Sequence, residues 1–496
     1  MNKKAIVKII GFILCFEALF MLPSTIIAAT ARQYDLFAFI IVPVGMFAIG
    51  IPCTLIKPAN KNFYTKDGFM TVALSWLLMS FFGALPYYIS GAIPSFMNSF
   101  FETVSGFTTT GATILSEIES LPKATLFWRN MTHWIGGMGV LVLTLAIIPS
   151  FGGRGVHLLN AETTGISGTK LVPSLRKTAL ILYGIYTALT LILVLCLLLA
   201  GMNVFDSFLH AMSTAGTGGF SNRNISIGAY NSPVIEIILT VFMYLFGINF
   251  SIYFVILTKG FAKALRSEEL RLYTIILGSA MLLIALNLMK TYGGNFFTAL
   301  RYSSFQAASV MSTTGFSSTD FNLWPTFSKT ILLLLIALGS CASSTAGGIK
   351  IVRILVMFKA ARVELKKTTH PNIVKSVTLD GRAIDNTVLH NVWVFFLLYV
   401  TTIVSGTILI SINGFDFTTT FSSVLATVSN AGPGLNLVGP LGNYSAFSSF
   451  SKIVFSFCML IGRLEIFPVL FLFIPKKVFR SNDMKRKKRT FSTDKS

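Results

Sequence analysis

Apolar segments dominate the pattern of hydrophobic and polar positions along the chain. A membrane-spanning helix needs about 20 mainly apolar residues, and we expect ten such spans. Two come first, and the other eight form four pairs: 5–28, 36–56, then 68–93 with 124–148, 176–199 with 233–258, 270–289 with 328–358, and 390–412 with 451–474. Within each pair lies a shorter apolar segment that we expect to enter the membrane and turn back: 94–109, 202–217, 295–313 and 415–429.

Four ten-residue windows lie at the ends of these short segments and align without a gap. Each is rich in small and hydroxyl residues and has a glycine at its ninth position. The windows are TVSGFTTTGA from Thr103, AMSTAGTGGF from Ala211, AASVMSTTGF from Ala307 and VLATVSNAGP from Val424, with glycines at Gly111, Gly219, Gly315 and Gly432. Phe100, Phe208 and Phe421 each lie eleven residues before their glycine, whereas the third repeat has Ser304 there. Internal repeats set the architecture of a chain.

We therefore predict an all-α polytopic membrane protein with four span, re-entrant pore helix, span repeats around a central ion pore. The expected units are a two-helix N-terminal extension (1–60), repeats at 66–150, 174–262, 270–362 and 385–478, and a basic cytoplasmic tail (479–496). The N-terminus also resembles a secretory signal peptide. The apolar run from Ala5 to Ala28 is long enough to span and carries Glu17, so we expect a retained helix; cleavage would leave the downstream orientation unchanged.

The composition agrees with a membrane protein. Hydrophobic residues make up 53% of the chain and charged residues 12%, with a mean hydropathy of +0.72, whereas soluble proteins contain about 25% charged residues. The net charge of +21 comes from basic residues that gather in a few loops and the tail, so we expect a lipid bilayer and no nucleic acid as partner. The five cysteines lie in or beside apolar runs, which supports neither disulfides nor a zinc site.

The distribution of basic residues predicts the orientation. The loops between repeats carry most of them, namely Arg154, Lys170, Arg176, Lys177, Lys259, Lys263, Arg266, Arg271, Lys359, Arg362, Lys366, Lys367, Lys375 and Arg382. The segments that follow the glycine windows carry few. By the positive-inside rule, both termini and the inter-repeat loops are cytoplasmic, and the short segments enter from outside. Asp206 and Asp416 precede or begin such segments, where a carboxylate suits a helix N-terminus and would also concentrate cations.

The windows have the properties of a cation filter. Irregular backbone at membrane depth is tolerated where protein buries it or where it lines a water-filled path, and a ring of backbone carbonyls can replace the hydration shell of potassium. We predict a potassium site at Thr110, Gly111, Gly218, Gly219, Thr314, Gly315, Ala431 and Gly432. Because each window is short, we expect looser selectivity than a TVGYG filter gives. Glycine among small residues also marks close helix packing, but four windows in register favour the filter.

The chain resembles the Trk/Ktr/HKT superfamily of potassium transporters over essentially its whole length. The resemblance rests on TTTGA at Thr108, TGGFS at Thr217, STTGFSSTDFNLWP at Ser312, SNAGPG at Ser429, WRNMTHWIGGMGV at Trp128, GSCASSTAGGIK at Gly339 and GRLEIFP at Gly462. The two N-terminal spans favour the Trk branch. A serine at the first filter position goes with sodium transport in plant relatives, so Gly111 implies potassium. The resemblance further implies a bacterial inner-membrane location, a homodimer and a cytoplasmic TrkA-type nucleotide-binding regulatory subunit.

Two features fit a gate. The second span of the third pair is interrupted by residues rich in Gly, Ser and Ala, which hold a helix poorly; the candidates are Gly339, Ser343, Ser344, Thr345, Gly347, Gly348 and Lys350. The resemblance implies an intramembrane loop beneath the filter that blocks the path until it moves, and a packed kink is the alternative. Arg463 lies inside the last span, where a charge is costly and would act as a barrier to cations. The alternatives are an ion pair with Glu465 or a side chain that reaches the cytoplasmic surface.

Other functions receive little support. A membrane enzyme needs converging acid, base or metal-ligating groups, and the spans offer only Arg463, Glu465 and Glu17. The chain carries no Rossmann or P-loop motif, so we expect no organic cofactor, and potassium is the transported ion. A sodium-permeable relative and a proton- or sodium-coupled symporter of the same fold stay open, because the sequence does not decide between coupled and channel-like transport.

Overall fold

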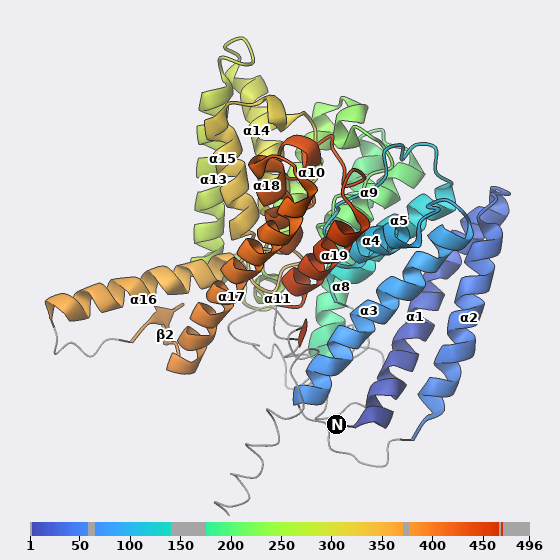
Figure 1. Ribbon diagram of the computed structural model, residues 1–496. Helices are drawn as coiled ribbons and strands as arrows, with labels where there is room; N and C mark the ends of the chain where they lie inside the picture. The colour runs from blue at the N-terminus through green and yellow to red at the C-terminus, as the bar shows by residue number, and fades with distance from the viewer. Residues whose placement is uncertain (1, 58–64, 140–174, 371–375, 466–467, 470–496) are drawn as a thin grey trace, which may run out of the picture.

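The computed structural model describes residues 2–57, 65–139, 175–370, 376–465 and 468–469 (Figure 1). Several predicted segments lie outside these residues. They are the end of the first repeat at 140–150, the basic loop that follows it up to residue 174, the part of the final span after Glu465 except residues 468–469, and the tail at 479–496. The described part is helical apart from loops, short 3₁₀ turns and one hairpin of two two-residue strands, β1 (Thr378–Leu379) and β2 (Arg382–Ala383).

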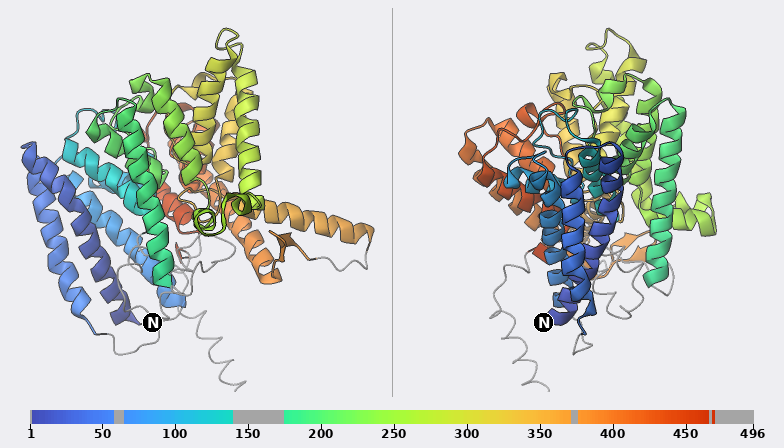
Figure 2. Two further views of the ribbon diagram at one scale, coloured as in Figure 1. Left: turned by 180° about the vertical axis from the view of Figure 1, so that it is seen from behind. Right: turned by 90° about the vertical axis from the view of Figure 1, so that its right-hand side faces the viewer.

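The N-terminal extension is a pair of antiparallel helices, α1 (Lys3–Thr30) and α2 (Leu36–Leu55), that packs beside α3 (Figures 1 and 2). Glycine lets the two backbones approach closely. A Cβ on Gly11 would lie only 2.8 Å from the Gly50 carbonyl oxygen, so a larger residue would push the helices apart. Glu17 is buried in the middle of α1.

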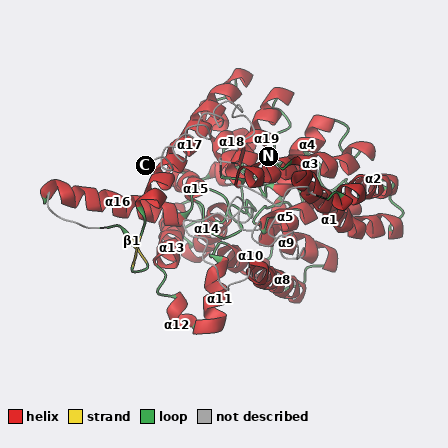
Figure 3. Ribbon diagram, turned by 90° about the horizontal axis from the view of Figure 1, so that it is seen from below, coloured by secondary structure: helices red, strands yellow, loops and turns green. Residues whose placement is uncertain are grey.

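A long helix, a short helix and a return helix follow one another four times. The long helices are α3 (Thr65–Ile89), α8 (Leu175–Leu199), α13 (Glu268–Leu288) and α17 (Asn386–Ile410). The short helices are α4 (Phe96–Phe107), α9 (Val204–Gly216), α14 (Phe296–Met311) and α18 (Phe417–Val428). The return helices are α5 (Lys123–Gly137), α10 (Pro233–Phe246), α15 (Thr326–Leu338) and α19 (Ser449–Arg463). The short helices surround a central set of loops (Figure 3), and they coincide within a few residues with the expected re-entrant segments.

The return helices are short within the described residues, although the first and fourth predicted spans extend beyond those residues and the third is interrupted where the sequence predicts. They contain 15, 14, 13 and 15 residues, fewer than the roughly 20 that a straight span requires. The span expected over 233–258 is divided, because α10 ends at Phe246 and α11 (Phe250–Lys259) continues at an angle of 88°. The Asn249 side chain starts the new helix by accepting a hydrogen bond from the Ser251 N–H. In the described residues six helices meet the length and hydropathy of a span, or seven with the bent pair, so ten spans stay a prediction.

Two return helices end against the short helix of their own repeat. A Cβ on Gly136 of α5 would lie 1.9 Å from the carbonyl oxygen of Phe107, the last residue of α4. A Cβ on Gly462 of α19 would lie 2.1 Å from the carbonyl oxygen of Val428, the last residue of α18. The first and fourth repeats therefore use glycine at the same place, where a return helix touches the C-terminal end of a short helix.

Alanine at Gly136 is expected to destabilise the protein, because the added methyl overlaps a main-chain oxygen that cannot rotate away. Overpacking of this kind costs about 1–3 kcal/mol, and we expect a lower melting temperature of the purified protein in detergent. Gly184→Ala in α8 is the matched control, since nothing lies within 4 Å of its Cβ position. Equal melting temperatures for the two variants would contradict the close contact.

One helix projects from the bundle. α16 (Ile351–Thr369) follows the loop after α15 and extends sideways from the bundle, with the β1–β2 hairpin beside it (Figures 1 and 2). Lys359 of α16 contacts the Glu268 carboxylate at the start of α13 and donates to the Thr378 carbonyl at 2.8 Å. The Glu268 N–H donates to Asp380 at 2.8 Å. These contacts fasten α16 and the hairpin to the third repeat.

Candidate functional site

Each short helix ends in the same left-handed turn. The residue two before the window glycine has a positive φ of 54° to 57°: Thr109, Thr217, Thr313 and Asn430. The next residue donates its N–H to a carbonyl five residues back at 2.8–2.9 Å, in the pairs Thr110 to Ser105, Gly218 to Ser213, Thr314 to Ser309 and Ala431 to Ala426. This bond closes the end of a helix in a Schellman motif. Four separate sequences thus bring the chain out of a helix with one geometry.

The four windows meet in a closed ring. A Cβ on each window glycine would overlap a carbonyl oxygen of the next window: Gly111 with Gly218 (1.9 Å), Gly219 with Thr314 (2.0 Å), Gly315 with Ala431 (2.6 Å) and Gly432 with Thr110 (2.6 Å). The order returns to its starting point after four contacts. All eight residues predicted for the potassium site take part, as a glycine, as the carbonyl that faces a glycine, or as both.

These positions favour glycine over any residue with a Cβ. The four window glycines have φ values of 78° to 81°, a region that L side chains rarely adopt, and there is no room for a Cβ. Among the described residues, no hydrogen bond reaches the carbonyl oxygens of Thr110, Gly218, Thr314 or Ala431. Buried carbonyls normally have a donor. Four carbonyl oxygens that lack a hydrogen-bond donor and lie in one ring are suited to bind a dehydrated cation.

Side chains around the ring hold the windows in place through hydrogen bonds. The hydroxyls of Thr108 and Thr110 lie 2.8 Å apart, and those of Ser312 and Thr314 lie 2.7 Å apart. Asn430 donates to the Thr110 hydroxyl at 3.0 Å and so connects the fourth window to the first. The next carbonyl of the fourth window, that of Gly432, accepts the Tyr444 hydroxyl at 2.9 Å. The windows are therefore held from their sides, which leaves the four ring carbonyls unengaged.

The loop over residues 339–350, which we call the 339–350 loop, is not helical, as the sequence predicts. It lies against the third and fourth windows. The Gly347 N–H donates to the Thr313 hydroxyl at 2.8 Å, and a Cβ on Gly347 would lie 2.0 Å from the Ser429 carbonyl oxygen. Gly339 and Gly348, with φ of 67° and 77°, pack face to face where the loop begins and ends.

The break between α10 and α11 holds the other side of this loop. The Cys341 N–H donates to the Gly247 carbonyl at 3.1 Å, and the Phe250 N–H donates to the Ser343 carbonyl at 3.1 Å. Ala342 donates its N–H to the Glu269 carboxylate of α13 at 2.6 Å. Sequence reasoning missed this arrangement, although the Gly-Ile-Asn sequence at 247–249 was a possible signal of a helix end.

Arg463 joins three elements. From the end of α19 its guanidinium donates to the carbonyls of Thr345 at 2.6 Å and Gly137 at 2.7 Å, and also to that of Gly136. It therefore connects the 339–350 loop to the C-terminal end of α5, where a positive charge is favourable. The Glu465 carboxylate, the alternative partner, lies against Arg353 at 2.6 Å.

The remaining gate candidates bond within the loop or to its surroundings. Ser344 donates to the Cys341 carbonyl at 2.6 Å, and Thr345 donates to the Phe246 carbonyl at 3.4 Å. Lys350 is 2% exposed, and its ammonium donates to the Ala346 carbonyl. The gate candidates thus lie in the 339–350 loop or, in the case of Arg463, bond to it, and the loop as a whole contacts two windows, the break between α10 and α11, and α19.

Asp206 and Asp416 are structural at their helix starts. Asp206 accepts from Asn222 and from the Tyr230 hydroxyl, both at 2.6 Å. Asp416 caps α18 by accepting the Thr419 N–H at 3.0 Å, and the hydrogen bonds from Thr419 lower the pKa of its carboxyl. Asp416 therefore has the capping role. Asp206 does not, because α9 is capped by Asn203, which accepts the Asp206 N–H at 2.8 Å.

Two charged residues that the sequence did not single out lie beside the first and second windows. Glu102 of α4 and Arg129 of α5 form an ion pair of 2.7 Å with side chains 0% and 3% exposed. A carboxylate inside the first re-entrant segment was the available signal.

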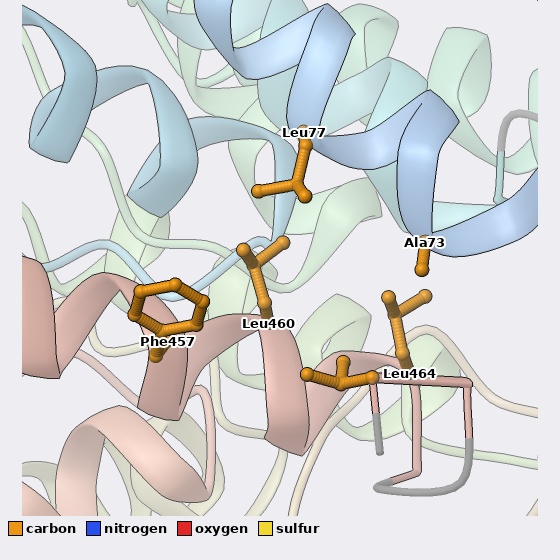
Figure 4. A pocket seen from close by; sticks show the side chains of 6 residues that line it. Ala73, Leu77, Phe457, Leu460 and Leu464 are labelled. Atoms are coloured by element: carbon orange, nitrogen blue, oxygen red, sulfur yellow. The ribbon is translucent and has the colours of Figure 1, made fainter. Parts of the chain in front are cut away.

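An apolar hollow between α3 and α19 takes no part in this site. It is lined by Ala73, Leu77, Phe457, Leu460, Leu464 and Val469 (Figure 4). Because its walls offer no polar side chain, it does not suit a cation. The described residues also contain no group of three or more His, Cys, Asp or Glu that could hold a metal ion.

Comparison with known proteins identifies the family. Residues 46–481 match the TrkH family, which is described as a cation transport protein. The chain belongs to the TrkH family. Curated relatives are the Trk system potassium uptake protein TrkG of Escherichia coli K12, 33% identical over 95% of this chain and 97% of the relative, and TrkH of Salmonella typhimurium, 35% identical over 96% and 99%. These TrkH-family proteins are transporters and not enzymes.

A solved TrkH-family structure has the same fold. The crystal structure of the potassium transporter TrkH from Vibrio parahaemolyticus matches with a TM-score of 0.85 and 32% identity, over 96% of this chain and 99% of that chain. This match confirms the predicted helical membrane-transporter fold and the resemblance read from the motifs. The chain is a membrane transporter with several apolar spans.

Proposed function

We propose that this chain takes up potassium across the bacterial cytoplasmic membrane through a filter formed by its four windows. The closed ring of the Thr110, Gly218, Thr314 and Ala431 carbonyls, each beside the glycine of a neighbouring window, is the observation that carries the proposal. The relatives named as potassium uptake proteins support potassium as the ion. The membrane potential, worth about 2.3 kcal/mol per charge per 100 mV, draws the cation inward.

The 339–350 loop is the gate in this proposal. Its contacts with Thr313 and Ser429 put it directly against two of the four windows. Ions pass when the loop moves away, and the bonds of Arg463 to Thr345 and to the end of α5 resist that movement. The positive charge of Arg463 also opposes a cation that leaves the ring.

A cytoplasmic TrkA-type nucleotide-binding subunit controls the gate, and the chain assembles as a homodimer. Both termini and the inter-repeat loops face the cytoplasm, because these loops carry most of the basic residues. α16 supports a docking role, since it continues directly from the gate loop and projects from the bundle with Phe358 and Leu365 66% and 68% exposed. A partner that shifts α16 would therefore pull on the 339–350 loop.

Rubidium uptake into liposomes that hold the purified chain alone tests the function. We expect uptake that external potassium inhibits and that equal sodium inhibits at least about tenfold less, which corresponds to about 1.4 kcal/mol. Equal inhibition by sodium would favour a sodium-permeable relative, and dependence on an imposed proton or sodium gradient would favour a symporter. Absence of uptake both with and without the TrkA-type subunit would contradict the proposal.

A further inference from the structure

A polar side chain of each short helix reaches the chain that leaves the filter. It lies nine residues before the window glycine in the first three repeats and ten before it in the fourth, at Glu102, His210, Gln306 and Ser422. The hydrogen bonds, of 2.9–3.5 Å, join Glu102 to Thr113 and Ile114, His210 to Ser221, Gln306 to Ser318 and Thr319, and Ser422 to Leu435. These partners lie two to four residues after the glycines. All four side chains are buried, so each repeat fastens the outer end of its own window.

The first repeat is the one that uses a charge. One Glu102 oxygen accepts the Thr113 hydroxyl at 2.9 Å, and the other accepts the Ile114 N–H at 3.0 Å. The first of these oxygens also pairs with the Arg129 Nε at 2.7 Å. Glu102 thus holds the chain just after Gly111 and binds Arg129 with the same carboxylate.

Arg129 carries this attachment to the second window. Its Nη1 donates to the Ser221 carbonyl at 2.9 Å, and its guanidinium lies 3.5 Å from the centre of the Phe220 ring. Phe220 and Ser221 directly follow Gly219. A guanidinium is planar and presents donors in a fixed fork, so the pair fixes the outer end of the second window relative to that of the first.

We propose that the Glu102–Arg129 pair is a positioning element that sets the ion preference of the filter. The inference rests on the proposed function. Because the pair touches both windows just past their glycines, a change in its geometry shifts the first and second carbonyls of the ring relative to the other two. Coordination by the ring then becomes unequal, and potassium loses its advantage over sodium.

Arg129→Lys tests the positioning role while the positive charge is kept. A lysine ammonium cannot reach Glu102 and Ser221 with the same spacing or stack flat on Phe220. We expect rubidium uptake to persist with the preference over sodium lowered about tenfold, the effect of one lost hydrogen bond to a charged group. Thr113→Val is the second variant: it removes one donor to Glu102 and leaves the ion pair in place, so it is expected to fold and to lower the preference several-fold.

The matched control is the ion pair of Glu236 in α10 and Arg301 in α14. It is bidentate, at 2.6 Å for both bonds, and contacts none of the windows. Arg301→Lys is expected to leave the preference unchanged. If Arg129→Lys folds and keeps the wild-type preference, or if it does not fold and Thr113→Val keeps that preference, the positioning role is overturned. An unselective wild-type protein would instead overturn the proposed filter itself.

Discussion

Gly219→Ala is expected to abolish potassium-selective uptake. The Cβ of alanine would lie 2.0 Å from the Thr314 carbonyl oxygen, and φ at this position is 79°. A left-handed conformation costs a residue with a Cβ about 1–2 kcal/mol, and the overlap with a main-chain oxygen forces the second and third windows apart. The ring then loses one of its four contacts between neighbouring windows. Rubidium uptake into liposomes, with sodium as competitor, measures the result.

The control for this variant is Gly278→Ala in α13, where nothing lies within 4 Å of the Cβ position. It changes the same residue type within the same protein and is expected to retain wild-type uptake. If Gly219→Ala folds and transports potassium with wild-type preference, the ring is not the filter.

Arg463→Gln is expected to raise the flux of the isolated protein. Glutamine has no charge and cannot bond to Thr345, Gly136 and Gly137 together, as the guanidinium does. The 339–350 loop therefore loses its attachment to α5, and the electrostatic barrier disappears with it. A hydrogen bond from a charged group contributes about 1.5–3 kcal/mol, so we expect rubidium uptake without a partner subunit to increase about tenfold or more.

Arg362→Gln is the control for the lost charge, because Arg362 lies exposed on α16. It is expected to leave the flux of the isolated protein at the wild-type level. An unchanged flux in folded Arg463→Gln would show that Arg463 neither bars the path nor retains the loop.

The positions of the windows and of the 339–350 loop could be predicted from the sequence because local composition determines them. Gly111, Gly219, Gly315 and Gly432 recur in register, and each turn needs a conformation that favours glycine. The 339–350 loop interrupts an apolar helix with residues that form helices poorly. In both cases the signal lies in neighbouring residues.

The bend after Phe246 could not be predicted in the same way. Residues 233–258 form an almost continuous apolar run, which is equally compatible with a straight span. What stabilises the bend is distant in sequence: Cys341 bonds to Gly247, and the Ser343 carbonyl accepts the Phe250 N–H.

The pairing of Glu102 with Arg129 could not be predicted either, because it too depends on contacts between residues that are distant in sequence. The two residues lie in different helices, and Ser221, the third member, belongs to another repeat. Periodicity identifies which faces of a helix are apolar, but it does not identify the partner of a buried charge. Such partners follow from tertiary packing.

The most direct test of the filter is the anomalous scattering of rubidium in crystals of the wild-type protein. We predict rubidium density inside the ring, bounded by the carbonyl oxygens of Thr110, Gly218, Thr314 and Ala431, and no such density in Gly219→Ala. Rubidium bound elsewhere in the bundle, with none inside the ring of the wild-type protein, would contradict the account.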